Sequence, residues 1–263
     1  MERAHSRRLG QYFLKNREKL RKIAACLEIA NGDTIVEIGP GHGELTKELV
    51  AGIENLEFRL IAIEKDEKLA RGLQEKFKNH KSIQIVHGDA LKILPELKIV
   101  NCKLKITGNI PYYITGKLLR TIGDLITNYK LPITTCVLTV QKEVAERICA
   151  KPPHMNLLAA AVRFWAEPKI IDYISKKDFK PQPDVDSAVV KFEIRNSKFE
   201  IQDSYYKLVR ILFKQPRKTI LNNLSVFKPK EEILPVLEKM GVNPGLRPQN
   251  LSVEDIKLLS RVL

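Results

Sequence analysis

An amide, a proline and a tyrosine stand together in Asn109-Ile110-Pro111-Tyr112, the stretch of this sequence best suited to chemistry. The Asn109 side-chain oxygen and the Ile110 carbonyl can accept hydrogen bonds from an amino group, while the Tyr112 ring offers a stacking surface. Pro111 stiffens the backbone between them. The tetrapeptide therefore fits a planar ligand with an exocyclic amino group. The alternative is an ordinary turn at the end of a strand, where Asn and Pro are common.

A glycine-rich loop, Glu37-Ile38-Gly39-Pro40-Gly41-His42-Gly43, follows an apolar run and precedes a helical pattern. Gly39 and Gly41 let a ligand approach the backbone without a Cβ in the way. A dinucleotide fingerprint requires Gly or Ala where the chain has Glu44, and no Walker-type phosphate loop is found. The loop therefore indicates a nucleoside ligand without phosphate, or else a simple tight turn.

Two acidic residues, Glu64 and Asp89, end the next two apolar runs. A carboxylate at the first place can accept from both hydroxyls of a ribose, and one at the second from an adenine amino group. Each acid taken alone is more typical of a helix N-cap. Together with the glycine loop, they predict a crevice for a nucleoside cofactor at the carboxyl edge of a parallel sheet.

Phe179 opens a proline-containing segment, residues 179–187, that precedes the last expected strand. Prolines make this segment stiff and exclude a helix interior. A rigid loop can hold an aromatic ring as a second stacking wall for a planar ligand. A buried hydrophobic anchor is the equally weighted alternative.

Short apolar runs predict the buried strands that position these residues, and helical patterns separate several of them. We expect strands at residues 34–38, 59–63, 83–87, 104–107, 135–140 and 188–194, and helices at 16–30, 43–50 and 66–77. Alternation of strand and helix indicates a doubly wound α/β fold with a parallel sheet and right-handed crossovers. The alternating pattern of residues 188–194 is typical of a half-buried edge strand.

The strand pattern stops after Arg195, and the remaining patterns predict helices at residues 204–224, 231–240 and 252–263. We therefore divide the chain into a Rossmann-like domain, residues 1–196, and a small helical domain, residues 197–263, that would bind RNA. The second domain is small for an independent hydrophobic core.

The chain is strongly basic, with a formal net charge of +14 over 263 residues. Such an excess predicts a polyanionic partner, nucleic acid first. Residues 1–22 hold eight Lys or Arg against two Glu. Solvated surface charge and contact with phosphates are equally weighted interpretations of this arm. The candidates for phosphate contact are Arg7, Arg8, Arg217 and Lys218.

Other features of the composition argue against a membrane, a secretory route and a metal. No run approaches the roughly 20 apolar residues of a membrane-spanning helix. The charged N-terminus lacks a secretory signal, so we expect a cytoplasmic protein. The cysteines are far apart and form no metal-binding pattern, which predicts reduced thiols and no metal site. They are Cys26, Cys102, Cys136 and Cys149.

Several motifs in order resemble those of the ribosomal RNA adenine N6,N6-dimethyltransferases of the KsgA type, over nearly the whole chain. Residues 10–14 look like the family's N-terminal cofactor motif, 37–43 like its glycine loop, 109–112 like its catalytic N-(L/I)-P-Y and 179–187 like its FxPxPxVxS motif. Further similar segments are residues 141–145, 217–219 and 247–252. The resemblance implies a Rossmann-like fold that uses S-adenosylmethionine.

The resemblance also implies roles for individual residues. Tyr112 and Phe179 would sandwich the target base, beside the catalytic Asn109. The family usually has His or Asn where this chain has Tyr12, which leaves only a backbone contact expected there. The implied cofactor contacts are Gln11, Tyr12, Leu14, Gly39, Gly41, Glu64, Asp89 and Asn109.

The implied activity is N6-dimethylation of two adjacent adenines in the 3′-terminal hairpin loop of small-subunit (16S) rRNA, by a monomer with a role in subunit biogenesis. One alternative is an erythromycin-resistance type 23S rRNA adenine N6-methyltransferase, a sister family in which isoleucine also occurs at position 110. The C-terminal motifs favour the small-subunit enzyme. The other alternative is a non-catalytic RNA-binding ribosome-assembly factor, against which the intact Asn109 motif argues.

Overall fold

The computed structural model describes residues 11–51, 56–97, 99, 102–195 and 202–262, which fall into two compact units. The first unit comprises Met1–Ala145 and Glu167–Ile194. The second comprises Glu146–Ala166 and Arg195–Leu263. The segment Glu146–Ala166 lies inside the first domain of the sequence-based division, and that division stays a prediction.

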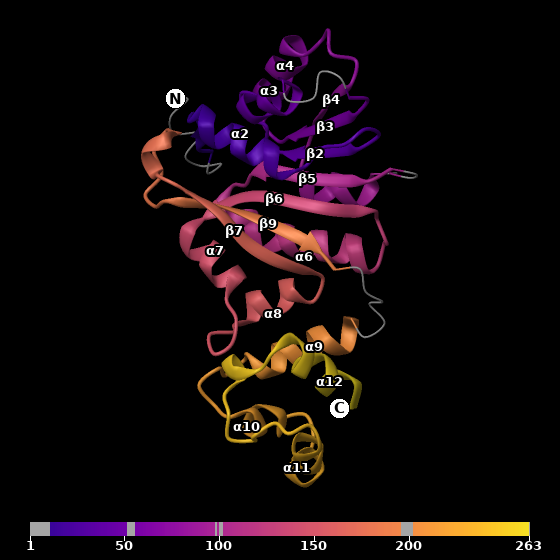
Figure 1. Ribbon diagram of the computed structural model, residues 1–263, viewed down its shortest axis with the longest axis vertical. Coiled ribbons are helices and arrows are strands. Elements are labelled where there is room, and N and C mark those ends of the chain that lie inside the picture. Colours follow the sequence, from indigo (N-terminus) through magenta and orange to yellow (C-terminus); the bar gives the residue numbers. More distant parts are fainter. Residues whose placement is uncertain (1–10, 52–55, 98, 100–101, 196–201, 263) are drawn as a thin grey trace. The chain divides into compact units, whose positions relative to one another are not determined.

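A seven-stranded sheet forms the centre of the first unit, with its strands side by side in the order β4-β3-β2-β5-β6-β9-β7 (Figure 1). Neighbouring strands pair in parallel from β4 through β3, β2 and β5 to β6, and β9 is antiparallel to β6. This topology confirms the predicted α/β class. The strands are β2 (Thr34–Ile38), β3 (Arg59–Glu64), β4 (Ile83–His87), β5 (Leu104–Asn109), β6 (Ile133–Gln141), β7 (Ala166–Ile174) and β9 (Ser187–Ile194).

The prediction of an edge strand at residues 188–194 is wrong, because β9 lies between β6 and β7 and β7 forms the edge. The first half of β9, Ser187 to Val190, is buried at every position, as in a strand covered on both faces. Alternation of buried and more exposed residues begins only at Lys191. The sequence pattern of the second half was therefore a poor guide to the whole strand.

Polar side chains after strand ends cap three helices of the first unit, α2, α4 and α5. Asn16, Asp66 and Asp89 each accept a hydrogen bond from a backbone N–H in the first turn of the following helix. The helices are α2 (Arg17–Cys26), α3 (Glu44–Ala51), α4 (Glu67–Lys76), α5 (Ala90–Ile93), α6 (Thr115–Thr127) and α7 (Lys142–Cys149), which continues into the second unit. Short 3-10 turns are η1 (Leu94–Glu96), η2 (Tyr112–Ile114) and η3 (Lys176–Asp178).

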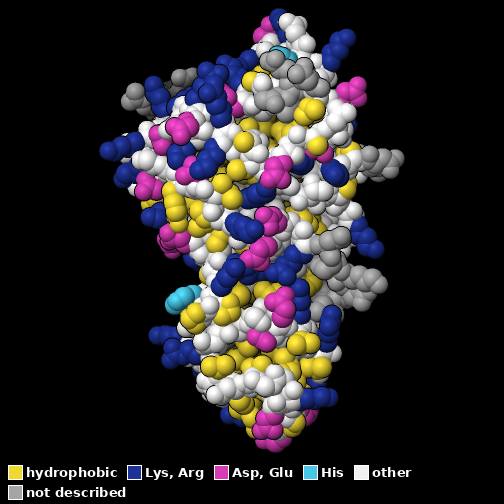
Figure 2. All heavy atoms as spheres, viewed as in Figure 1, with side chains coloured by type: hydrophobic (Ala, Val, Ile, Leu, Met, Phe, Trp, Pro, Cys, Tyr) yellow, Lys and Arg dark blue, Asp and Glu magenta, His cyan; other side chains and the backbone are white. Residues whose placement is uncertain are grey.

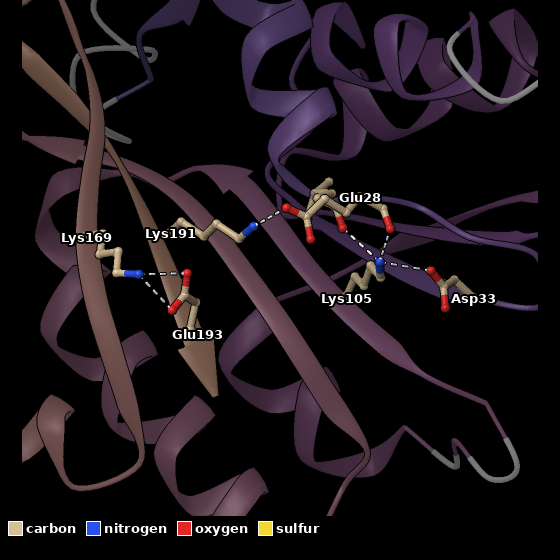
Figure 3. Close-up of polar contacts among 7 residues, drawn as sticks. Glu28, Asp33, Lys105, Lys169, Lys191 and Glu193 are labelled. Carbon is tan, nitrogen blue, oxygen red and sulfur yellow. Dashed lines mark hydrogen bonds and ion pairs between the residues drawn. The ribbon is translucent and has the colours of Figure 1, made fainter. Parts of the chain in front are cut away.

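Lys105 is a buried cation that joins β5 to the end of α2 (Figure 3). Its ammonium lies 3.0 Å from a carboxylate oxygen of Asp33, which is 2% exposed, and donates to the Leu27 carbonyl at 2.8 Å. It also donates to the Glu28 carbonyl. Carbonyls at a helix end have no intrahelical partner, so this lysine satisfies them and neutralises Asp33 at once.

The second unit is helical, and its core includes aromatic residues from both of its segments. The Phe164 and Tyr205 rings stack with centroids 4.5 Å apart, and the Tyr205 hydroxyl donates to the Ala160 carbonyl at 2.9 Å. The segment Arg195–Leu263 thus shares a core with the segment Glu146–Ala166, which comes before most of β7 in the chain. The elements are α8 (Leu157–Arg163), α9 (Gln202–Leu212), α10 (Ile220–Leu224), α11 (Lys230–Lys239), η4 (Pro248–Asn250) and α12 (Val253–Val262).

The prediction of one helix over residues 204–224 is wrong, because α9 ends at Leu212 and α10 begins at Ile220. Pro216 lies between them, and proline removes a backbone donor from a helix interior. The Thr219 hydroxyl accepts from the Asn222 N–H and caps α10. The break leaves an exposed basic loop with Arg217 and Lys218.

Candidate active site

An open cavity of about 770 Å³, partly continuous with solvent, lies at the carboxyl ends of β2, β3, β4 and β5. Ten of the predicted site residues line it, brought together from four strand ends and the segment before α2. They are Gln11, Tyr12, Gly39, Gly41, Glu64, Asp89, Asn109, Ile110, Pro111 and Tyr112. Ligands of doubly wound sheets bind at this edge.

The glycine loop bends at three glycines, Gly39, Gly41 and Gly43, whose φ values of 65°, 61° and 81° are unfavourable for other residues. A Cβ at Gly41 would lie 2.6 Å from a ring carbon of Phe13. Glycine at this position therefore allows the Phe13 ring of the N-terminal motif to pack against the loop. A simple tight turn would not need this space.

Two buried carboxyl groups, Glu37 and Glu64, flank the loop. One oxygen of Glu64 accepts the Gly41 N–H at 3.0 Å and the other accepts the Asp66 N–H at 2.9 Å. Burial raises the pKa of Glu64, while these N–H groups oppose the shift. Burial also raises the pKa of Glu37 to about 8. The Thr46 hydroxyl, which donates to Glu37 at 2.7 Å, acts to lower this pKa but does not offset the burial. A carboxylate accepts about four hydrogen bonds, so Glu64 retains capacity for ligand hydroxyls.

Asp89 both caps a helix and lines the cavity, which joins the two interpretations that the sequence left open. One oxygen accepts the Leu91 N–H at 3.0 Å, and the other lies 3.0 Å from the Lys65 ammonium. Partial burial acts to raise the pKa of Asp89, but the bonds from Lys65 and Leu91 outweigh it and lower the pKa overall. The carboxylate is thus charged at neutral pH and can accept from an amino group.

The side chain of Asn109 is held by the backbone of the N-terminal motif. Its amide nitrogen donates to the Tyr12 carbonyl at 2.5 Å. A carbonyl can only accept, so the nitrogen of Asn109 must face Tyr12. The amide oxygen is then the atom that can accept from the amino group of a ligand in the cavity.

Tyr112 lies on the turn η2, three residues after Asn109, and makes one contact through its hydroxyl and one through the face of its ring. Its hydroxyl lies 3.1 Å from the hydroxyl of Ser187, and its ring stacks on that of Tyr12 with centroids 5.5 Å apart. Burial raises the pKa of the Tyr112 hydroxyl, so this group stays neutral at physiological pH. Tyr112 therefore presents a flat, uncharged surface beside the Asn109 amide.

Leu14 and Phe179 do not line the cavity. They face each other across a two-stranded antiparallel ladder between β1 (Phe13–Leu14) and β8 (Phe179–Lys180). Both belong to the hydrophobic core, with exposed fractions of 3% and 5%. Phe179 is thus placed as the buried anchor in this structure, and its predicted stacking on a base stays a prediction.

The basic residues of the N-terminal arm that the structure describes are tied to carboxylates. Three acidic side chains, Glu44, Glu48 and Asp172, bind five cations of the arm. Figure 2 shows Asp and Glu among the Lys and Arg side chains over the end of the first unit where α2 lies in Figure 1. The five cations are Lys15, Arg17, Lys19, Arg21 and Lys22. Arg7 and Arg8 lie outside the described residues.

Sequence reasoning missed eight cavity residues, most of them direct neighbours of predicted ones. These neighbours lie at the strand ends and on the turns that follow them, so extending each motif by one residue would have found them. Ile114 needs one further step along η2. The missed residues are Phe13, Ile38, Ile63, Lys65, Gly88, Ala90, Tyr113 and Ile114.

Comparison with known proteins places the chain in a family. The model of the family "Ribosomal RNA adenine dimethylase" matches residues 2–263. The chain belongs to this family. A curated relative, Ribosomal RNA small subunit methyltransferase A of Dehalococcoides mccartyi, is 38% identical, with 95% of this chain and 86% of the relative aligned. The resemblance seen in the motifs is therefore confirmed.

Two solved structures of the same fold cover the chain almost completely. A dimethyladenosine transferase from Plasmodium falciparum has a TM-score of 0.78 at 27% identity, covering 94% of this chain and 95% of that one. The 23S rRNA methyltransferase ErmE has a TM-score of 0.73 at 25% identity, covering 95% and 99%. The predicted Rossmann-like methyltransferase fold is confirmed by these neighbours.

The hydrogen-bond acceptors that line the cavity suit S-adenosylmethionine. The Glu64 and Asp89 carboxylates could accept from ribose hydroxyls and an adenine amino group. At Gly39 a Cβ would meet only the Asn109 carbonyl, at 3.8 Å, so this part of the loop is open to a ligand. Among the described lining residues the single cation is Lys65, which is bound to Asp89, so the lining does not suit a phosphate. In the described ranges, no cluster of three metal-ligating side chains and no helix able to cross a membrane is found.

Proposed function

We propose that this chain transfers methyl groups from S-adenosylmethionine to the N6 atoms of two adjacent adenines in the 3′-terminal hairpin loop of small-subunit rRNA. It acts in the cytoplasm as a monomer, on a ribosomal subunit or its precursor. The observation that carries the proposal is the Asn109 amide, turned by the Tyr12 carbonyl so that its oxygen is the acceptor beside Tyr112. Family membership and the Dehalococcoides relative support the small subunit as the target.

S-adenosylmethionine, when bound, supplies an electrophilic methyl group. The Asn109 oxygen and the Ile110 carbonyl accept the N6 hydrogens of adenine, which favours the pyramidal nitrogen that the reaction requires. Tyr112 fixes the plane of the base and so the direction of attack. The nitrogen releases its proton to water or a nearby acceptor, so a dedicated general base is not expected.

A labelled-methyl assay tests the choice of RNA. We expect transfer to small subunits whose adenines are unmodified, and little transfer to protein-free large-subunit rRNA. Preferential labelling of large-subunit RNA would support the resistance-type activity instead. An absence of transfer to both, by a folded chain that binds the two RNAs, would support the non-catalytic assembly factor.

Removal of the Glu64 carboxylate should weaken S-adenosylmethionine binding about 10- to 150-fold. The expectation corresponds to roughly 1.5 to 3 kcal/mol for a hydrogen bond to a charged group. Calorimetry of Glu64→Ala would measure it. The matched control is Glu67→Ala, which removes an exposed carboxylate of α4 that does not line the cavity. Unchanged affinity in the folded Glu64 variant would remove this residue from cofactor binding.

The loop with Arg217 and Lys218 is an exposed basic surface that could bind RNA phosphates. The Asn223 amide donates to the Gln215, Lys218 and Thr219 carbonyls, which fixes the loop while both cations stay exposed. In contrast, the cations of α2 share carboxylate partners, which reduces their net charge. Arg7 and Arg8 remain in the proposal from their sequence position.

Loss of loop cations should therefore weaken the salt dependence of RNA affinity. In Arg217→Ala/Lys218→Ala, the log-log slope of affinity against salt should fall by roughly 0.7 to 0.9 for each phosphate contact removed, and likewise in Arg7→Ala/Arg8→Ala. Arg71→Ala/Lys78→Ala removes two exposed first-unit cations that pair with Glu67 and Glu75, and serves as the charge-matched control. Wild-type slopes in both test variants would show that these charges are only solvated.

A further inference from the structure

A lysine of the neighbouring helix α4 holds the tip of the glycine loop. The ammonium of Lys76, the last residue of α4, donates to the His42 carbonyl. A Cβ at Gly43 would lie only 3.2 Å from this ammonium, so Lys76 lies directly against the loop. The described lining of the cavity includes Gly39 and Gly41 of the same loop, but neither Lys76 nor His42. Lys76 would therefore act on a ligand there through the loop rather than by contact.

The first part of the loop is anchored to the sheet through its N–H groups. The Gly39 N–H donates to a carbonyl of β3 at 2.9 Å, and the Gly41 N–H donates to the Glu64 carboxylate at 3.0 Å. The His42 carbonyl follows these two anchors in the chain and is held from α4 by Lys76. Lys76 thus fixes the loop from the helix side, where the sheet anchors do not reach.

Stabilisation of α4 does not require this contact. A lysine in the last turn of a helix is favourable for that helix's dipole even when its ammonium lies in solvent. The Lys76 ammonium instead reaches the residues just before α3, where the dipole of α3 disfavours a cation. Burial lowers the pKa of Lys76, and the nearby Lys47 and Lys15 ammoniums lower it further, against the effect of Glu44. The placement therefore has an electrostatic cost, which the bond to the loop carbonyl offsets.

We infer that Lys76 is a positioning residue for the cofactor, whose bond to the His42 carbonyl keeps the glycine loop in the shape that presents Gly39 and Gly41 to S-adenosylmethionine. Glycine loses more backbone freedom on ordering than any other residue, and this loop contains three. A bond that orders the loop before the cofactor arrives removes part of this cost from binding. Lys76 thus acts on cofactor affinity and not on the chemical step. This inference rests on S-adenosylmethionine as the cofactor, which is part of the proposed function.

Calorimetry with S-adenosylmethionine on the full chain tests this role. In Lys76→Met we expect the affinity to fall about 3- to 10-fold, the range for one hydrogen bond. Lys76→Arg should retain most of the wild-type affinity, because arginine also donates to a carbonyl and keeps the charge. Lys78→Met is the matched control, since it removes an exposed lysine just beyond α4 that pairs with Glu75.

Steady-state methylation of small-subunit RNA by the same variants separates positioning from other roles. In Lys76→Met the KM for S-adenosylmethionine should rise as the affinity falls, while kcat at saturating cofactor and the affinity for RNA stay at wild-type values. Thermal unfolding shows whether each variant keeps its fold. Lys76→Gln, whose shorter side chain also lacks the charge, replaces Lys76→Met if the latter unfolds.

Three results would overturn the inference. The first is wild-type cofactor affinity in folded Lys76→Met. The second is a fall in affinity that Lys76→Arg does not restore, because the loss would then not come from the bond to the loop. The third is a fall in RNA affinity without one in cofactor affinity, which would assign Lys76 to the RNA instead.

Methylation by the wild-type chain distinguishes this inference from the proposed function. If the wild type modifies small-subunit adenines and Lys76→Met binds the cofactor normally, only the inference fails. If the wild type binds S-adenosylmethionine but transfers no methyl group to adenine, the proposed function fails, and the calorimetry still decides the role of Lys76.

Discussion

Asn109→Ala lowers the rate of methyl transfer by about 10²- to 10³-fold while the chain keeps its fold. The variant loses an acceptor for the adenine amino group, and one such preorganised group contributes roughly 2.7 to 4 kcal/mol to transition-state stabilisation. It also frees the Tyr12 carbonyl, whose bond to Asn109 holds the N-terminal motif against β5. Single-turnover kinetics with saturating cofactor would measure the chemical step.

Asn109→Asp separates the two roles of this residue. Aspartate keeps an acceptor for adenine, but its charged carboxylate cannot donate to the Tyr12 carbonyl. We expect this variant to be impaired too, because the acceptor is no longer oriented. The matched control is Asn128→Ala, an exposed amide at the end of α6. Turnover near the wild-type rate in folded Asn109→Ala would remove this residue from the mechanism.

Lys105→Met destabilises the first unit by about 3 to 5 kcal/mol. Removing one partner of a buried ion pair leaves the other charge buried without compensation, and Asp33 is 2% exposed. The Leu27 carbonyl also loses a donor. Urea unfolding monitored by circular dichroism would give the free energy of unfolding, and Asp33→Asn in the same chain should recover part of the loss.

Lys169→Met provides the matched control in the same sheet (Figure 3). Lys169 and Glu193 form a pair with side chains 54% and 48% exposed, and such pairs contribute about 0 to 1 kcal/mol. The large effect should therefore depend on burial rather than on the loss of a lysine. Equal, small losses in both variants would contradict the assignment of Lys105 as a buried structural cation.

The core strands could be predicted because their apolar runs are short and bounded, as in β2, which is buried at all five positions. Strand β7 was missed because charged residues such as Lys169 interrupt its pattern. The two-residue strands β1 and β8 were beyond prediction, since Leu14 and Phe179 pair across most of the chain. Local patterns hold no information on such distant pairing.

The candidate site was predictable where chemistry and strand ends coincide, as at Glu64, Asp89 and Asn109, which all line one cavity. The aromatic contacts were not. The position of Tyr12 on Tyr112 depends on how the segment before α2 crosses the sheet edge, and the burial of Phe179 depends on its pairing with β1. Both are tertiary outcomes that residue type alone does not determine.

Mass analysis of nucleosides from small-subunit rRNA treated with the chain and S-adenosylmethionine tests the central claim most directly. The account predicts N6,N6-dimethyladenosine, confined after fragment mapping to two adjacent adenines of the 3′-terminal hairpin loop, and its near absence with Asn109→Ala. Methylation at another atom, in another part of the RNA, or at wild-type levels in the Asn109 variant would contradict it.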